Sequence, residues 1–286
     1  MIVDTHAHVV TNDRTRYPRL ADTPRAGSIP TITDIGQTEW PETTAEIMIA
    51  EMDKAKVAKS TLVQSYFLYE YDNSYAIDSA NAHPDRFVAI VTLDPTDPTA
   101  PDKLSELAAQ GAKGIRFMRG RLPRCTLGEP ETHALWRRIA ELKIPLCVHD
   151  KVEELRRLPP MLEKFPEITV ALDHGWGHKV GEPPYEMLAP LFALARYPNI
   201  RVKTAINNIE AARGEVSTPQ IFYTRLIEVF GAERIMWSSN APAHPRFGSI
   251  ESRLAVAQDT LKFLDAASRN WIFGETALAV WPWLRS

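Results

Sequence analysis

Short apolar, β-branched segments alternate along the chain with longer segments of helical periodicity. Helical patterns at residues 44–56, 102–110 and 130–142, for example, each precede such a segment. Apolar runs of this kind, hydrophobic at almost every position, are typical of parallel strands buried on both faces. Eight of them in 286 residues predict a single-domain (β/α)8 TIM barrel that spans residues 1–286. The predicted strands are residues 2–5, 61–64, 87–91, 114–117, 146–148, 169–172, 201–204 and 235–237.

An open, doubly wound sheet is the main alternative to the barrel. Such a sheet would carry a Gly-x-Gly-x-x-Gly loop after an early strand and would gather its polar residues at one switch point. The chain has no such motif after an early strand, and its polar residues follow many different strands. Residues 9–41 form a polar, proline-bearing segment that is too long for an ordinary βα loop. We expect it to cap the mouth of the barrel, with an irregular surface excursion as the alternative.

Charge and composition narrow the classes of partner. The chain has 33 Lys and Arg against 36 Asp and Glu, which excludes a nucleic-acid partner bound through a bulk positive charge. It opens without a signal-like segment, has no apolar run of bilayer length, and places its two cysteines, Cys125 and Cys147, in unlike contexts. We therefore expect a cytoplasmic protein without a membrane partner. The apolar tail at residues 280–284 is predicted to cover the barrel base, or alternatively to form a homo-oligomer contact.

Histidines follow three of the predicted strands. His6 and His8 come at the end of the first strand, two residues apart, so that both side chains point to one side of it. His149 directly follows the fifth strand and His174 follows the sixth. In a TIM barrel, the carboxyl ends of the strands carry the active site. We therefore expect these four imidazoles to meet there, while unrelated polar residues at strand ends are the alternative for His6 and His8 taken alone.

The ordered set of motifs resembles the amidohydrolase superfamily. The resemblance is to the amidohydrolase-2 branch, which includes lactonases of the 2-pyrone-4,6-dicarboxylate lactonase and sulfomuconolactone hydrolase type and, further off, nonoxidative decarboxylases. The resemblance covers essentially the whole chain and implies hydrolysis by an activated water molecule. The matching pieces are His6-Ala7-His8, His149, Asp173-His174-Gly175 and the segment at residues 234–242.

The eighth strand departs from the family pattern Trp-Gly-[Ser/Thr]-Asp-x-Pro. The aspartate of that pattern serves as a metal ligand or as the general base, and its position here is taken by Asn240. A neutral amide neither accepts a proton from water at pH 7 nor supplies an anionic ligand. Three explanations compete: a deliberate Asp→Asn substitution made to trap substrate, a different base, or a chain that is no longer a hydrolase. The intact remainder of the motif set favours the first.

Metal binding is left open by the resemblance, because the family includes metal-dependent and metal-independent members. Three neutral imidazoles and a water molecule would suit one divalent ion, Zn or Mn, with His6, His8 and His149 as ligands. Arg116 stands after the fourth strand, where a bridging Lys or Glu would be needed for a second ion. In the metal-free alternative, His6, His8 and His174 polarise the scissile carbonyl.

Candidate substrate contacts indicate an anionic small molecule. Arg116 and Arg121 follow the fourth strand and align with arginines that hold substrate carboxylates in the lactonase, whereas Arg119 and Arg124 are interpreted as solvated. Further polar and aromatic candidates, including supporting histidines, follow other strands, from the second to the eighth. These are Tyr66, His149, Trp176, Asn207, His178 and His244.

The first functional hypothesis is a hydrolase that opens a small anionic lactone or related cyclic ester or amide. His6, His8, His174 and Asn240 are its expected catalytic positions, with Asn240 impairing turnover. A metal-dependent decarboxylase or hydro-lyase of the same superfamily is the second hypothesis, although such enzymes prefer Glu-x-His on the first strand. A catalytically degenerate binding protein is the third.

Overall fold

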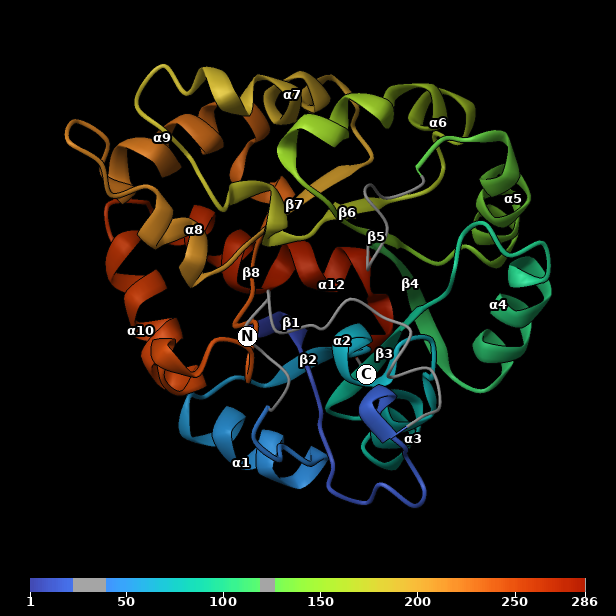
Figure 1. Cartoon of the computed structure of the whole chain (residues 1–286). Coiled ribbons are helices and arrows are strands. Elements are labelled where there is room, and N and C mark those ends of the chain that lie inside the picture. The colour runs from blue at the N-terminus through green and yellow to red at the C-terminus, as the bar shows by residue number, and fades with distance from the viewer. Residues whose placement is uncertain (23–39, 119–126, 286) are drawn as a thin grey trace.

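The computed structural model describes residues 1–22, 40–118 and 127–285. Eight parallel strands lie in the order β1-β2-β3-β4-β5-β6-β7-β8, at the centre of the molecule with the helices around them (Figure 1). The predicted (β/α)8 barrel is confirmed. The strands are β1 (Val3–Ala7), β2 (Lys59–Val63), β3 (Phe87–Thr92), β4 (Ala112–Met118), β5 (Leu146–His149), β6 (Val170–Leu172), β7 (Ile200–Thr204) and β8 (Ile235–Trp237).

The helices cover the outside of the strands (Figure 1). Strand β5 shows the predicted burial on both faces. Leu146 and Val148 point outward to the helices, whereas Cys147 points into the barrel interior, so the first three positions of the strand are buried and apolar and His149 ends it. The helices are α1 (Ala45–Lys54), α2 (Tyr66–Tyr69), α3 (Ser74–Ala82), α4 (Ala100–Ala109), α5 (His133–Leu142), α6 (Pro159–Lys164), α7 (Ala189–Phe192), α8 (Ile206–Ala211), α9 (Pro219–Phe230), α10 (Ile250–Thr260), α11 (Ala266–Asn270) and α12 (Thr276–Val280).

The barrel closes where β1 meets the chain just after β8. The backbone N–H of His8 donates to the carbonyl of Ala241 at 2.8 Å, and that of Asn240 donates to the carbonyl of His6 at 2.8 Å. The buried carboxylate of Asp4 accepts from the backbone N–H of Ser239 at 2.8 Å. These bonds set His6, His8 and Asn240 side by side at the carboxyl ends of the strands.

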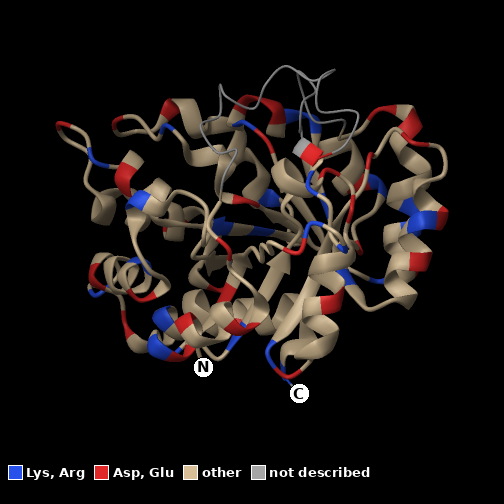
Figure 2. Cartoon of the chain, turned by 60° about the horizontal axis from the view of Figure 1, so that its bottom comes forward, with Lys and Arg blue, Asp and Glu red and all other residues tan. Residues whose placement is uncertain are grey.

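The C-terminal segment plugs the base of the barrel. Trp281, which follows α12, is fully buried among interior side chains such as Ile90 and Met236. Gly114 of β4 leaves room for it, because a Cβ there would lie 2.7 Å from Ile90 Cδ1 and 3.4 Å from Trp281 Nε1. Both termini lie at this end of the molecule (Figure 2). The expectation that residues 280–284 cover the barrel base is confirmed.

The described ends of segment 9–41 lie at the opposite end, over the strand termini. Val10 and Thr43 pair as an antiparallel bridge, and the backbone N–H of Thr11 donates to the hydroxyl of Tyr69 at 3.0 Å. Trp40 packs into the apolar cluster formed there by Val10, Tyr69 and their neighbours. Within the described ranges, no helix has both the length and the apolar character needed to cross a lipid bilayer.

Candidate active site

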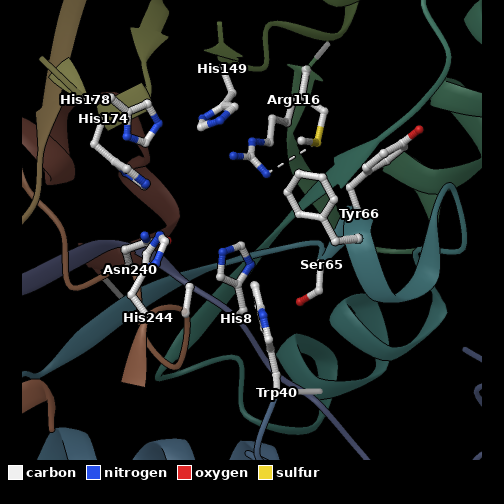
Figure 3. Close-up of a pocket in the computed structure, with 13 residues that line it drawn as sticks. His8, Trp40, Ser65, Tyr66, Arg116, His149, His174, His178, Asn240 and His244 are labelled. Atoms are coloured by element: carbon white, nitrogen blue, oxygen red, sulfur yellow. Dashed lines mark hydrogen bonds between the residues drawn. The ribbon is translucent and has the colours of Figure 1, made fainter. Parts of the chain in front are cut away.

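A cavity of about 250 Å³ opens at the carboxyl ends of the strands (Figure 3). Its described wall contains one guanidinium group, five imidazoles, one side-chain amide and three aromatic rings, and it contains no carboxylate. A wall of this composition suits a small, flat, anionic ligand. The lining residues are His8, Trp40, Ser65, Tyr66, Phe67, Arg116, Met118, His149, His174, His178, Asn240, Ala243 and His244.

His8 is a neutral imidazole with a defined tautomer. Its Nδ1 lies 2.7 Å from the carbonyl oxygen of Val63, which can only accept, so Nδ1 carries the proton and Nε2 is an acceptor. Burial, followed by the nearby charge of Arg116, lowers the pKa of His8 to about 3. The side chain of Asn240 lies near His8 in the same cavity wall.

His6 and His174 complete a cluster of neutral imidazoles. The His6 ring stands edge-on to the rings of His8 and His174, with a centroid distance of 4.8 Å to each. Burial lowers the pKa of both His6 and His174 well below the usual range. His6 is fully buried and lies behind the other two rather than in the described cavity wall.

Asp173 joins three side chains beneath the cavity. Its Oδ2 accepts from Arg116 Nε at 2.7 Å, and its Oδ1 lies 2.9 Å from Lys203 Nζ and 3.4 Å from His6 Nδ1. Burial alone would raise the pKa of Asp173, but Lys203, His6 and Arg116 outweigh burial and hold that pKa well below its usual range. The carboxylate therefore stays ionised and anchors Arg116, whose guanidinium group faces the cavity.

Asn240 adopts a left-handed backbone conformation with φ of 54°, which asparagine tolerates better than most residues. Arg253 of α10 supports this turn by donating from Nη1 to the carbonyls of Ser239 at 2.9 Å and Asn240 at 3.0 Å. The Asn240 side chain thus reaches the cavity beside His8, at the position where the family pattern has aspartate.

His149 depends on the absence of a side chain at Gly175. A Cβ at Gly175 would lie 2.6 Å from His149 Cε1 and 2.8 Å from its Nδ1. The His149 ring stands 5.9 Å from that of His174, on the same side of the cavity as Arg116 (Figure 3). Together with His6 and His8, all four histidines predicted at strand ends are brought together.

Three other predicted contacts turn out differently. Trp176 is buried in the outer core with its ring 6.3 Å from that of Phe222, and it is absent from the described cavity wall, because the turn after β6 directs it toward α9. Asn207 also lies outside that wall and supports it by donating to the carbonyl of His174 at 3.5 Å. Arg121 lies outside the described residues. Tyr66, in contrast, lines the cavity as expected.

Sequence reasoning missed the two groups that hold Arg116 in place. Asp173 was noted only as part of the Asp173-His174-Gly175 motif, and Lys203 was given no role. A signal was present for Lys203, because it lies inside a strand predicted to be buried, where a lysine needs a partner. Trp40 and Ser65 of the cavity wall carry no comparable signal.

Comparison with known proteins identifies the family of this chain. A family model for amidohydrolases matches residues 3–283. The chain belongs to the amidohydrolase family. A search of curated protein sequences finds no match.

Solved structures of low sequence identity share the fold of this amidohydrolase. A probable 2-pyrone-4,6-dicarboxylic acid hydrolase of Acinetobacter baumannii, with citric acid bound, has a TM-score of 0.76 at 20% identity, covering 98% of this chain and 99% of its own. A Burkholderia multivorans amidohydrolase with bound zinc has a TM-score of 0.71 at 16% identity, covering 99% of each chain. A dihydroxybenzoic acid decarboxylase of Polaromonas sp. JS666, with manganese and 2-nitroresorcinol, has a TM-score of 0.68 at 16% identity, covering 100% and 98%.

Metal ions in two of those structures pose the question of a metal in this one. In residues 1–22, 40–118 and 127–285, no three His, Cys, Asp or Glu side chains converge as a ligand group. Asp173 and Asn240 supply no free anionic ligand either, since Asp173 forms ion pairs with Arg116 and Lys203 and the side chain of Asn240 is uncharged. His6, His8 and His149 are thus not placed as a ligand group in the described structure, and metal binding by them stays a prediction.

Proposed function

We propose that this amidohydrolase opens the ring of a small, planar, anionic cyclic ester. The observation that carries the proposal is the cavity wall, in which Arg116 is set among imidazoles and aromatic rings with no carboxylate in the described part. A guanidinium group with Nη1 and Nη2 turned to a cavity binds a carboxylate in a bidentate manner. The rings of Trp40 and Tyr66 would enclose a flat substrate.

The neutral imidazoles divide the remaining tasks. Nε2 of His8 is an acceptor and orients the attacking water, while an N–H of His174 donates to the carbonyl oxygen as negative charge develops on it. Water oxygen bonds to the carbonyl carbon, the ring C–O bond breaks, and the water proton ends on the released oxygen. That proton needs a carrier, and a His8 whose pKa is about 3 is a poor one at pH 7.

We therefore expect the lack of an efficient general base to limit hydrolysis by this chain, and the substitution Asn240→Asp tests this expectation. A carboxylate beside His8 would take the water proton, so that kcat should rise by about 10²-fold or more, as is typical of general-base catalysis. The assay is ring opening of a panel of carboxylated and uncarboxylated lactones. Asn81→Asp is the matched control, because it makes the same amide-to-carboxylate change at an exposed position of α3.

The same experiment separates the competing functions. If Asn240→Asp raises turnover of no carboxylated lactone or cyclic amide, the hydrolytic assignment is wrong. Decarboxylation needs no activated water, so Asn240 would not block it, and release of carbon dioxide from 2,6-dihydroxybenzoate by the unchanged chain would favour the decarboxylase class. Tight anion binding without turnover in either form would favour a binding protein.

A further inference from the structure

A lysine that the proposed chemistry does not use is buried inside the barrel beneath the cavity. The side chain of Lys203 is 0% exposed, and it is not part of the described cavity wall. Its Nζ lies 2.9 Å from Asp173 Oδ1, 3.3 Å from Cys147 Sγ and 5.2 Å from the centre of the Trp281 ring. Removing an ammonium group from water is costly, so three partners converging on it mark a built position.

Asp173 connects this lysine to the cavity. One carboxylate oxygen faces Lys203, and the other accepts from Arg116 Nε at 2.7 Å. Because Asp173 holds Nε, the two terminal nitrogens of the guanidinium group point to the cavity, where Nη1 lies 3.7 Å from the sulfur of Met118. Nη1 and Nη2 are thus the edge that meets a ligand (Figure 3).

A count of charges shows what Lys203 adds. Arg116 is the one permanently charged side chain in the described cavity wall, and its ion pair with Asp173 alone would be neutral. Lys203 on the second oxygen of Asp173 returns a net charge of one positive unit to the cluster. Lys and Arg positions occur on the central strands as well as on the outer helices (Figure 2). In a low-dielectric interior that charge acts on a ligand without touching it.

We infer that Lys203 is a positioning residue for anion binding, which acts through Asp173 to keep Arg116 aimed and net cationic. The inference rests on the proposed function only in that the ligand is an anion. A purely structural Lys203 would stabilise the fold equally whether the cavity holds an anion or a neutral molecule.

The test compares a planar dianion with its neutral counterpart on the full chain. Binding of isophthalate and of isophthalamide is measured by calorimetry for the unchanged protein and for Lys203→Met and Lys203→Gln. We expect isophthalate affinity to fall about tenfold or more in both variants through loss of one buried charge, while isophthalamide affinity changes less than about twofold. In the Asn240→Asp background, KM for a carboxylated lactone should rise with little change in kcat.

Met236→Leu is the matched control, since Met236 is fully buried in the same interior cluster and carries no charge. Unchanged isophthalate affinity in the Lys203 variants would overturn the inference, and so would a loss in Lys203→Met that Lys203→Gln restores, because a hydrogen bond rather than a charge would then matter. If Lys203→Met does not fold, Lys203→Gln decides. If the unchanged protein binds no isophthalate, the anionic ligand of the proposed function is wrong and the inference falls with it.

Discussion

At the scale of single residues, the position of His149 depends on the absence of a side chain at Gly175. Replacement of this glycine by alanine puts a Cβ within 2.6 Å of His149 Cε1, and the ring must move. Gly175→Ala should therefore weaken isophthalate binding by about tenfold, as displacement of one polar contact from its productive position does. Calorimetry measures the change, with circular dichroism to show that the barrel is intact.

Gly128→Ala provides the comparison for that substitution. Its Cβ would come closest to the flexible side chain of Met161, at 3.2 Å from Cγ, and Gly128 is not part of the described cavity wall. We expect its isophthalate affinity to match that of the unchanged protein. Equal affinity in Gly175→Ala as well would mean that His149 contributes nothing to the ligand.

Residue-scale sequence reasoning found the imidazoles but not what holds them. His6, His8, His149 and His174 could be predicted because strand ends of a barrel share one face. The ion pair of Lys203 with Asp173 could not, because it joins β7 to the residue after β6, and the register between two neighbouring strands is not written in the apolar pattern of either one.

At the scale of elements, the plug after α12 carries part of the stability of the barrel. Trp281 is fully buried and closes the interior from below. Trp281→Ala should lower the free energy of unfolding by about 3–5 kcal/mol, because a large cavity replaces the indole ring. Urea unfolding monitored by far-UV circular dichroism measures the loss.

Trp283→Ala controls for the loss of a tryptophan in the same segment. Trp283 is 38% exposed and its ring lies 5.4 Å from Lys113 Nζ, so its removal should cost only about 1 kcal/mol. A comparable loss in both variants would show that the C-terminal segment is not a plug but a loosely attached cover.

Element boundaries show the limit of periodicity. The first strand was predicted to end at Thr5, yet β1 continues to Ala7. It continues because the backbone of His6 and His8 pairs with residues 240 and 241 on the far side of the closure. The local pattern of apolar residues predicts the number and the order of the strands. It cannot predict pairing with a partner more than two hundred positions away.

At the scale of the whole molecule, the buried imidazoles make stability depend on pH. The pKa of His8 in the folded chain is about 3, below its ordinary value of 6.5. As pH falls from about 6.5 toward 3, His8 is therefore protonated in the unfolded chain but not in the folded chain. Stability is thus lost on acidification, by roughly 2 kcal/mol at pH 5 from His8 alone. His6 and His174, whose pKa values are also lowered, act in the same direction.

Urea unfolding at pH 7.5 and at pH 5.0 measures this dependence, and His8→Gln isolates the share of one imidazole. The difference between the two pH values should shrink in His8→Gln. Asp173, whose pKa is lowered, matters only as pH falls below about 4, and Asp4, whose pKa is raised by burial, opposes the trend. A difference that survives intact in His8→Gln would contradict the neutral His8 on which the tautomer rests.

The bond between Asp4 and Ser239 links residues 235 positions apart, and it belongs to the same seam that aligns His6 with Asn240. Closing so long a loop is slow and entropically expensive. The cavity wall is complete only when this seam is formed, because His8 and Asn240 lie on its two sides. Ligand binding at the proposed site would therefore depend on this seam, since without its bonds His8 and Asn240 are not held side by side, even if the helices around the barrel are formed.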